Sequence, residues 1–228
     1  KNNLKGGQME DAFKKFKEML PEGQLDHGDV ITLVEQEPDR FFPFFWFNPN
    51  VKEEEKDQSY EILGEHFEKG FSGVKIHSGI HLIKIPRDVE ELVSFMQEQD
   101  ENIPLYIHSV PRVSFFSGIR AKDLAKLAKR HPNLPIIVGH CAYAMEYAVE
   151  LGLMLKNYEN VYFETSCSIP YGLLNLIKSI GSKRILFGSD APVTNPISLE
   201  IEKILALPVG DDVKRDILSN NAKSLFEP

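Results

Sequence analysis

From residue 73 onward, the chain alternates short apolar runs with longer stretches whose apolar residues recur at helical spacing. Five of the apolar runs end in a polar or ionisable residue, namely His77, His108, His140, Ser166 and Asp190. These residues follow one another after 31, 32, 26 and 24 positions, and a strand with its crossover helix needs about 30 residues. The pattern therefore predicts consecutive units of parallel strand and helix.

The same periodicity predicts the individual elements. An aromatic run over 41–47 reads as a sixth strand, which precedes the other five. Helices are expected after the strands over 88–99, 121–130, 144–156, 171–180 and 199–207, and shorter helices over 10–20, 29–36, 59–69, 211–218 and 222–226. We find no linker and no low-complexity segment, and we predict a single α/β domain over residues 1–228.

Six parallel strands fit either an open doubly wound sheet or a TIM-barrel-like fold that lacks two units. No glycine-rich phosphate loop follows an early strand, which weakens the nucleotide-binding alternative. An open sheet would confine the site to one switch point, whereas a barrel lets several strand ends converge. Ligand-type residues end several strands here, so the pattern favours the TIM-barrel-like fold.

Composition narrows the classes of partner. The 228 residues carry a formal net charge of −8, which argues against a nucleic-acid or anionic-membrane surface. No apolar stretch reaches membrane-spanning length, and the two cysteines form no CxxC pair, which favours a reduced, cytoplasmic setting. We expect a small-molecule substrate, and whether the chain forms a homo-oligomer is left open.

Three of the strand-end residues are suited to binding a metal ion. His108, His140 and Asp190 offer the nitrogen and oxygen ligands that zinc and similar ions prefer, with one position open for water. Asp190 follows Gly-Ser at the point where a buried strand breaks into a turn. There it could bind the ion or take a proton from bound water. A single strand-end histidine is usually a cap or loop residue, and such an aspartate is often a turn former. Three such residues at the ends of strands in one series of units favour a common site.

Other residues are candidates for substrate binding. Lys75 and His77 alternate with apolar neighbours, so both should face the barrel interior, because burial against the helices would be costly. Lys75 could bind an anionic substrate group or form a structural ion pair. Ser166 at its strand end and Arg112 in the loop 109–120 are further candidates.

The remaining residues of interest have ordinary structural interpretations. Cys141 and Cys167 each follow a strand end and could approach the site, although small buried thiols are the default interpretation. Trp46 and its neighbouring phenylalanines are most simply core residues. His81 lies in a loop that could line the mouth of the site.

An ordered set of motifs resembles one known family. The matching segments are 38–44 with Asn48-Pro49, Gly70-Phe-Ser-Gly-Val-Lys-Ile-His77, Leu105-Tyr-Ile-His108, Ile137-Val-Gly-His140, Val161-Tyr-Phe-Glu-Thr-Ser166, Ile185-Leu-Phe-Gly-Ser-Asp190-Ala-Pro192 and Asn221-Ala-Lys-Ser-Leu-Phe226. They resemble the amidohydrolase-related ("amidohydrolase 2") metal-dependent hydrolases, a group that also includes decarboxylases of aromatic and muconate-like acids.

The resemblance implies a distorted TIM barrel with a mononuclear site, commonly zinc, with manganese or magnesium as alternatives. By resemblance, His108 is a metal ligand, His140 binds metal or polarises the substrate, and Asp190 contacts metal and activates water. The family's first strand carries a His-x-His pair, and no such pair occurs in this sequence. We therefore expect that the first one or two units are absent from the chain.

Three functions follow as hypotheses. The leading one is a metal-dependent hydrolase that cleaves a C–N, ester or lactone bond of a small molecule with metal-activated water. The second is a non-oxidative decarboxylase of an aromatic or muconate-like acid, which would use the same centre. The third is a catalytically inactive relative or a binding protein, which the missing His-x-His pair favours.

Overall fold

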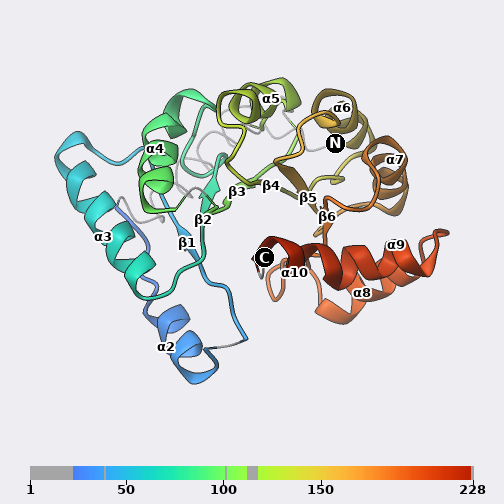
Figure 1. Cartoon of the computed structure of the whole chain (residues 1–228), viewed down its shortest axis with the longest axis horizontal. Coiled ribbons are helices and arrows are strands. Elements are labelled where there is room, and N and C mark those ends of the chain that lie inside the picture. The colour runs from blue at the N-terminus through green and yellow to red at the C-terminus, as the bar shows by residue number, and fades with distance from the viewer. Residues whose placement is uncertain (1–22, 39, 101, 112–117, 227–228) are drawn as a thin grey trace, which may run out of the picture.

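A parallel sheet forms the centre of the molecule. The computed structural model describes residues 23–38, 40–100, 102–111 and 118–226, so the predicted helix over 10–20 and Arg112 lie outside the described residues (Figure 1). The six strands are β1 (Phe44–Trp46), β2 (Gly73–His77), β3 (Leu105–His108), β4 (Ile136–Gly139), β5 (Val161–Glu164) and β6 (Ile185–Leu186). They lie side by side in chain order, and each neighbouring pair is parallel.

This strand order decides between the two predicted folds. A doubly wound sheet reverses its strand order at a switch point, whereas the order here runs from β1 to β6 without reversal. The sheet within the described residues is thus a consecutive part of a barrel wall, and the TIM-barrel-like prediction is confirmed.

Helices surround the sheet in an arc from α3 to α8 (Figure 1). The α-helices are α2 (Gly28–Gln36), α3 (Lys56–Glu68), α4 (Glu90–Gln99), α5 (Ala121–Arg130), α6 (Met145–Leu155), α7 (Pro170–Ile180), α8 (Ile197–Leu205), α9 (Asp211–Arg215) and α10 (Asn221–Phe226). Two short 3-10 turns, Glu53–Glu55 and Arg87–Val89, precede α3 and α4. None of the helices in the described residues is long and apolar enough to cross a membrane.

Two predicted elements differ in extent from those observed. The strand predicted over 41–47 is shorter, because its ladder with β2 is regular only over Phe44–Trp46. Pro43 has no N–H to donate to a ladder. The helix predicted over 211–218 ends as α9 at Arg215 and continues as a π-helical turn, Asp216–Asn220.

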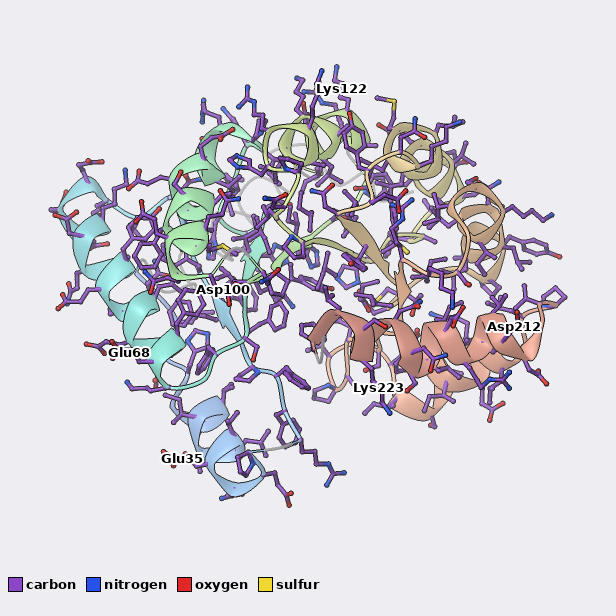
Figure 2. All side chains as sticks on the ribbon, in the orientation of Figure 1. Glu35, Glu68, Asp100, Lys122, Asp212 and Lys223 are labelled. Carbon is purple, nitrogen blue, oxygen red and sulfur yellow. The ribbon has the colours of Figure 1, made fainter. Side chains whose placement is uncertain are left out.

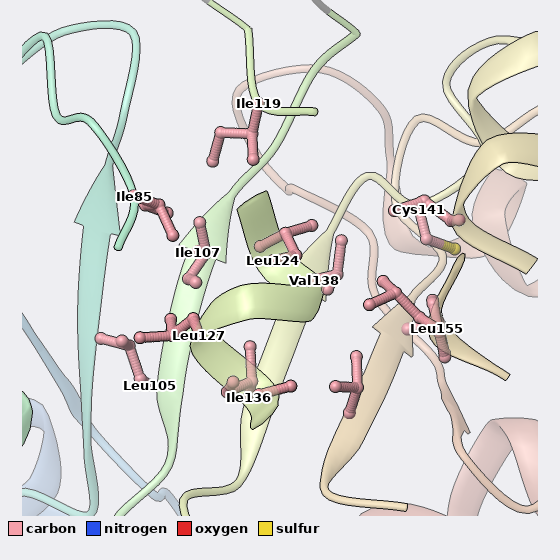
Figure 3. Packing of buried hydrophobic residues seen from close by; sticks show 14 of the residues in the cluster. Ile85, Leu105, Ile107, Ile119, Leu124, Leu127, Ile136, Val138, Cys141 and Leu155 are labelled. Atoms are coloured by element: carbon pink, nitrogen blue, oxygen red, sulfur yellow. The ribbon is translucent and has the colours of Figure 1, made fainter. Parts of the chain in front are cut away.

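The two faces of the sheet have different environments. Successive side chains of a strand point to opposite faces, and in β3 the fully buried Leu105 and Ile107 pack beneath α5 (Figure 3). Leu124 and Leu127 of α5 are also fully buried in this cluster. Tyr106 and His108 of β3 point to the other, concave face and are only partly buried. The apolar alternation therefore directs the polar strand residues to one shared face.

The outer edge of β1 is paired by side chains from the segment that precedes it. The Trp46 N–H donates to Nε2 of His27 over 2.9 Å. The Gln24 amide accepts from the Asn48 N–H at 2.8 Å and donates to the Asn48 carbonyl at 3.0 Å. An unpaired strand edge is a template for association with other chains, and these side chains cover this edge.

The C-terminal helix reaches back to the first strand. The ring of Phe226 in α10 stacks on Phe42 with a centroid distance of 5.3 Å, and it lies 5.9 Å from the Phe44 ring. These contacts bring the end of the described chain next to the beginning of the sheet.

Candidate metal centre

Three residues that follow consecutive strands place ligand atoms together. His140 follows β4, Cys167 follows β5 and Asp190 follows β6, and one ligand atom from each lies within 4.8 Å of the others. In the part of the chain that the structure describes, no other group of three histidine, cysteine, aspartate or glutamate side chains has this spacing. His140 is buried, whereas Cys167 and Asp190 are partly exposed.

The backbone of these three residues is strained in the same way. Their φ angles are +57° for His140, +55° for Cys167 and +53° for Asp190. Among the described residues, Leu82 is the other non-glycine residue with a positive φ. Such conformations cost about 1–3 kcal/mol each and tend to occur at functional sites. The three residues with this backbone conformation are the same three whose ligand atoms lie together.

A row of rings extends from His140 across the concave face. His108 Nδ1 lies 3.0 Å from His140 Nε2, and the His108 ring stacks on His77 with a centroid distance of 3.6 Å. His77 stacks in turn on Trp46 at 5.7 Å with an interplanar angle of 11°. His81 meets the edge of Trp46 at 6.3 Å. The row leads from the candidate centre to the outer strand of the sheet.

His77, His81 and His108 are neutral near pH 7. Burial lowers the pKa of His77 to about 3, and the nearby Lys75 ammonium adds to this effect. Burial likewise lowers the pKa of His81 to about 4 and that of His108 well below its ordinary value. Metal-binding imidazoles must be neutral, so His108 meets this requirement.

A buried carboxylate organises the residues around His140. Glu164 Oε2 accepts hydrogen bonds from the Tyr106 hydroxyl (2.9 Å), the His140 backbone N–H (3.1 Å) and the Ser166 hydroxyl (2.8 Å). Its Oε1 accepts from the Ser166 backbone N–H at 2.8 Å. A Cβ at Gly188 would lie 1.2 Å from Oε1, so only glycine leaves space for this carboxylate.

Ser166 links this carboxylate to the His140 ring. Its Oγ lies 2.8 Å from His140 Nδ1 and 2.8 Å from Glu164 Oε2. The hydroxyl has one proton, and the carboxylate can only accept it. Ser166 therefore donates to Glu164 and accepts from a protonated Nδ1, which leaves Nε2 of His140 as the lone-pair nitrogen. A histidine that binds a metal through one ring nitrogen is typically oriented by a hydrogen bond from the other ring nitrogen.

Lys75 places a positive charge beside the row of rings. Its Nζ lies 5.3 Å from the Trp46 ring centroid and 5.1 Å from that of Tyr106. Lys75 forms no ion pair within the described residues, so the structural ion pair considered from the sequence is not observed there. Trp46 Nε1 and His81 Nδ1 are buried without a hydrogen-bond partner in the same part of the chain. These two nitrogen atoms and the Lys75 ammonium are therefore available to a ligand on the concave face.

The donor set fits a divalent metal ion. Imidazole, thiolate and carboxylate are all ligands of zinc, and they bind it at about 2.0 to 2.3 Å, so that two of them lie at most about 4.5 Å apart. The group of His140, Cys167 and Asp190 is close to that size. The 3.0 Å separation between His108 and His140 nitrogens is also compatible with two ligands of one ion.

The structure brings together most of the residues singled out from the sequence. His108, His140 and Asp190 gather at the strand ends, Lys75 and His77 lie beside them on the concave face, and Ser166 contacts His140 rather than open space. Arg112 lies outside the described residues. The catalytic, metal-binding and substrate-binding roles of these residues stay predictions.

Three residues have a place that the sequence interpretation missed. Cys167, which the sequence interpretation placed near the site only as the less favoured alternative to a buried thiol, joins the ligand group. Trp46, taken as core, stacks on His77 and is only partly buried. Glu164 was not singled out. Its position three residues before Cys167 and directly after an aromatic strand residue carried a usable signal, because an acidic residue within a buried strand needs partners.

One comparison with known proteins identifies the family of the chain, and another identifies its fold. The sequence profile of a family described as Amidohydrolase matches residues 7–227. An uncharacterized TIM-barrel protein from Bordetella bronchiseptica is similar in structure, with a TM-score of 0.72, 20% identity and coverage of 89% of this chain and 72% of that chain. No curated protein matches the chain.

Two further solved structures carry functional names. A dihydroxybenzoic acid decarboxylase from Polaromonas sp., with bound manganese and the inhibitor 2-nitroresorcinol, has a TM-score of 0.63 and 19% identity, with coverage of 87% and 73%. A probable 2-pyrone-4,6-dicarboxylic acid hydrolase from Acinetobacter baumannii has a TM-score of 0.64 and 15% identity, with coverage of 90% and 80%. At these identities, the likeness shows the fold.

Proposed function

Because the chain belongs to the amidohydrolase family, we propose that it is a metal-dependent hydrolase that cleaves a C–N, ester or lactone bond of a small molecule. The observation that supports this most is the group of His140, Cys167 and Asp190, whose ligand atoms lie within 4.8 Å of one another. Hydrolases of this chemistry need a metal site and a carboxylate at the same place, and Asp190 supplies the carboxylate.

Different residues of the chain would have different roles in hydrolysis. When bound by His140 and Asp190, with His108 adjacent, a divalent ion supplies Lewis acidity and makes water more acidic. The Asp190 carboxylate accepts the proton from the attacking water and returns it to the leaving group. Ser166, which contacts Nδ1 of His140, orients this ring so that its Nε2 lone pair is available to the ion. The neutral His77 and His108 rings lie beside His140 on the concave face.

The position of Lys75 supports the proposal that the substrate is an acid. An ammonium between two aromatic faces, without an ion-pair partner in the described residues, is available for a carboxylate of the substrate. The flat faces of Trp46 and Tyr106 beside it favour a planar acid. The names of the two relatives, which refer to dihydroxybenzoic and pyrone dicarboxylic acids, agree with this class of substrate.

Replacement of Asp190 tests the hydrolase directly. We expect Asp190→Asn to lower kcat by about 100-fold or more, because the amide cannot accept the proton. Asp212→Asn is the matched control, since Asp212 is exposed on α9 away from the sheet (Figure 2). Hydrolysis should be measured on a panel of lactones, esters and amides of planar acids, together with metal content by mass spectrometry. Full activity of metal-free protein, or unchanged activity of Asp190→Asn, would contradict the proposal.

A non-oxidative decarboxylase is the second candidate. The similarity to a dihydroxybenzoic acid decarboxylase with bound manganese supports it, as does the aromatic surround of Lys75. The same preparation, incubated with a panel of hydroxybenzoates, discriminates the two reactions. Release of carbon dioxide without hydrolysis of any lactone, ester or amide would favour the decarboxylase. Absence of both reactions and of bound metal would favour the inactive relative.

A further inference from the structure

Cys167 differs from an ordinary buried thiol in its surroundings. It lies three residues beyond β5, is partly exposed, and has its Sγ 3.9 Å from Asp190 Oδ2 and 3.3 Å from Thr194 Oγ1. Its ligand atom lies within 4.8 Å of those of both His140 and Asp190. The sulfur therefore faces the same place as the two residues to which the hydrolase proposal assigns the metal.

The other cysteine shows what a structural thiol looks like in this chain. Cys141 is fully buried, its Sγ lies 3.9 Å from the Ser168 hydroxyl, and it is not part of the ligand group. Burial raises the pKa of both thiols, so the two cysteines differ instead in their exposure and their neighbours. The two cysteines thus occupy different environments, although both follow strand ends.

The chemistry of the donor set decides what such a group would bind. Thiolate sulfur is a soft ligand that favours zinc and similar ions, whereas magnesium and manganese prefer oxygen ligands. One imidazole, one thiolate and one carboxylate make three protein ligands, which is the number that catalytic zinc sites have when a fourth position stays open. His108, at 3.0 Å from His140, lies at the side of this group.

We propose that Cys167 is a metal ligand together with His140 and Asp190, and that its thiolate makes the centre selective for zinc over magnesium and manganese. The inference rests on the proposed function in that it assumes a metal at this site, and it adds a ligand type that the resemblance to the family does not imply. On binding, the sulfur–metal bond forms and the S–H proton is released to solvent.

Cobalt(II) provides the direct test, because a thiolate ligand gives a charge-transfer band in the near ultraviolet. Metal-free protein should be titrated with cobalt(II) as wild type, as Cys167→Gly and as Cys141→Ala. Glycine suits the left-handed backbone at position 167, so this variant removes the sulfur without adding strain. The Cys141→Ala variant is the matched control, since it removes the other thiol of the chain.

We expect the thiolate band in wild type and in Cys141→Ala, and its loss in Cys167→Gly. The affinity of Cys167→Gly for zinc should fall by more than about 10-fold, the smallest loss typical of removing an outer-shell partner. Its affinity for manganese should change much less. Zinc should also protect Cys167 of the wild-type protein from alkylation, which peptide mass spectrometry reads without any variant.

The outcomes separate this inference from the hydrolase proposal. Cobalt bound without a thiolate band, or a band that persists in Cys167→Gly, overturns the role of Cys167 and leaves hydrolysis possible. A thiolate band without hydrolysis of any compound in the panel sustains the ligand and contradicts the hydrolase. Alkylation of Cys167 that zinc does not slow also overturns the ligand role.

Discussion

Single residues around His140 show how a buried carboxylate can fix the tautomer of a neighbouring imidazole ring. Glu164 receives four hydrogen bonds from Tyr106, His140 and Ser166, and it forms no ion pair with another of the described residues. Burial and the adjacent Glu164 carboxylate raise the pKa of Tyr106 well above its ordinary value, so this phenol stays a donor. Such a network is stable because every donor around the carboxylate has its acceptor.

Replacing Glu164 by glutamine should remove the constraint on the tautomer of His140. The amide replaces one acceptor oxygen by a donor NH2 group, which cannot accept from Ser166 and the backbone in the same way. We expect the Nδ1-protonated form of His140 to give way to a mixture of tautomers in nitrogen-15 spectra of metal-free protein. The free energy of unfolding should fall by about 1–3 kcal/mol.

The matched control for this change is Glu68→Gln. Glu68 ends α3 and is exposed (Figure 2), so its replacement should leave both readouts unchanged. Ser166→Ala should repeat the tautomer change of Glu164→Gln with a smaller loss of stability. Identical His140 spectra in wild type and Glu164→Gln would refute the positioning role.

At the scale of elements, the edge of β1 depends on the segment that precedes α2. His27 accepts from the Trp46 N–H through Nε2, and its Nδ1 lies 2.9 Å from the Leu25 carbonyl. The ring must therefore be neutral and protonated at Nδ1. It is also packed at 4.2 Å against Phe45, so the residue contributes both a hydrogen bond and a buried surface.

His27→Leu should weaken this edge. Leucine keeps apolar volume but leaves the Trp46 N–H without its acceptor, which costs about 1–3 kcal/mol. Urea unfolding should show a lower midpoint, and light scattering should show more association, because a freed strand edge can pair with another chain. Glu35→Gln on α2 is the control, since Glu35 is exposed (Figure 2). An unchanged midpoint would contradict the edge role.

The same residue predicts part of the pH dependence of stability. Burial lowers the pKa of His27, although the contact with Leu25 acts in the opposite direction. The unfolded chain binds a proton at about pH 6.5 and the folded chain only at lower pH. The contribution of His27 is therefore complete above pH 6.5 and is lost as the pH falls toward its folded pKa. His27→Leu should show a smaller loss of stability than wild type between pH 7 and pH 5.

At the scale of the whole molecule, the two ends of the described sheet are joined by aromatic contacts. Phe226 of α10 packs on Phe42 and Phe44 at the first strand. The π-helical turn before α10 also binds the other end of the sheet, since the Phe187 N–H donates to the Ile217 carbonyl at 2.9 Å. The C-terminal segment thus connects β6 to β1 and shapes the concave face.

Phe226→Ala should loosen this connection. We expect the free energy of unfolding to fall by about 1–2 kcal/mol, less than for a fully buried phenylalanine because this ring is partly exposed. Tyr171→Ala is the control, because Tyr171 is 74% exposed and should change stability by less than about 0.5 kcal/mol. Thermal unfolding of the three proteins measures the difference. Equal stability of Phe226→Ala and wild type would show that the aromatic contact does not hold the ends.

Much of the fold could be predicted from hydrophobic periodicity. The helix predicted over 121–130 is observed with the same bounds as α5, because its apolar positions recur at helical spacing and bury one face. The β2 and β3 strands end at His77 and His108 as predicted. Their alternation also assigns Lys75 and His77 to one face, since side-chain direction in a strand follows from position alone.

The parts of the site that follow the strands could not be predicted in the same way. Cys167 and Asp190 lie three and four residues beyond β5 and β6, where no periodicity sets the side-chain direction. Their left-handed backbone turns point them toward His140.

The sequence alone therefore determined where the strands lie along the chain and the face of each strand residue, because burial of apolar side chains is a local pattern. Only the tertiary structure decided which loop residues meet, because the turns after β4, β5 and β6 and the space left by Gly188 depend on neighbouring strands being in place. The thiol of Cys167 and the carboxylate of Glu164 gained their positions from those contacts.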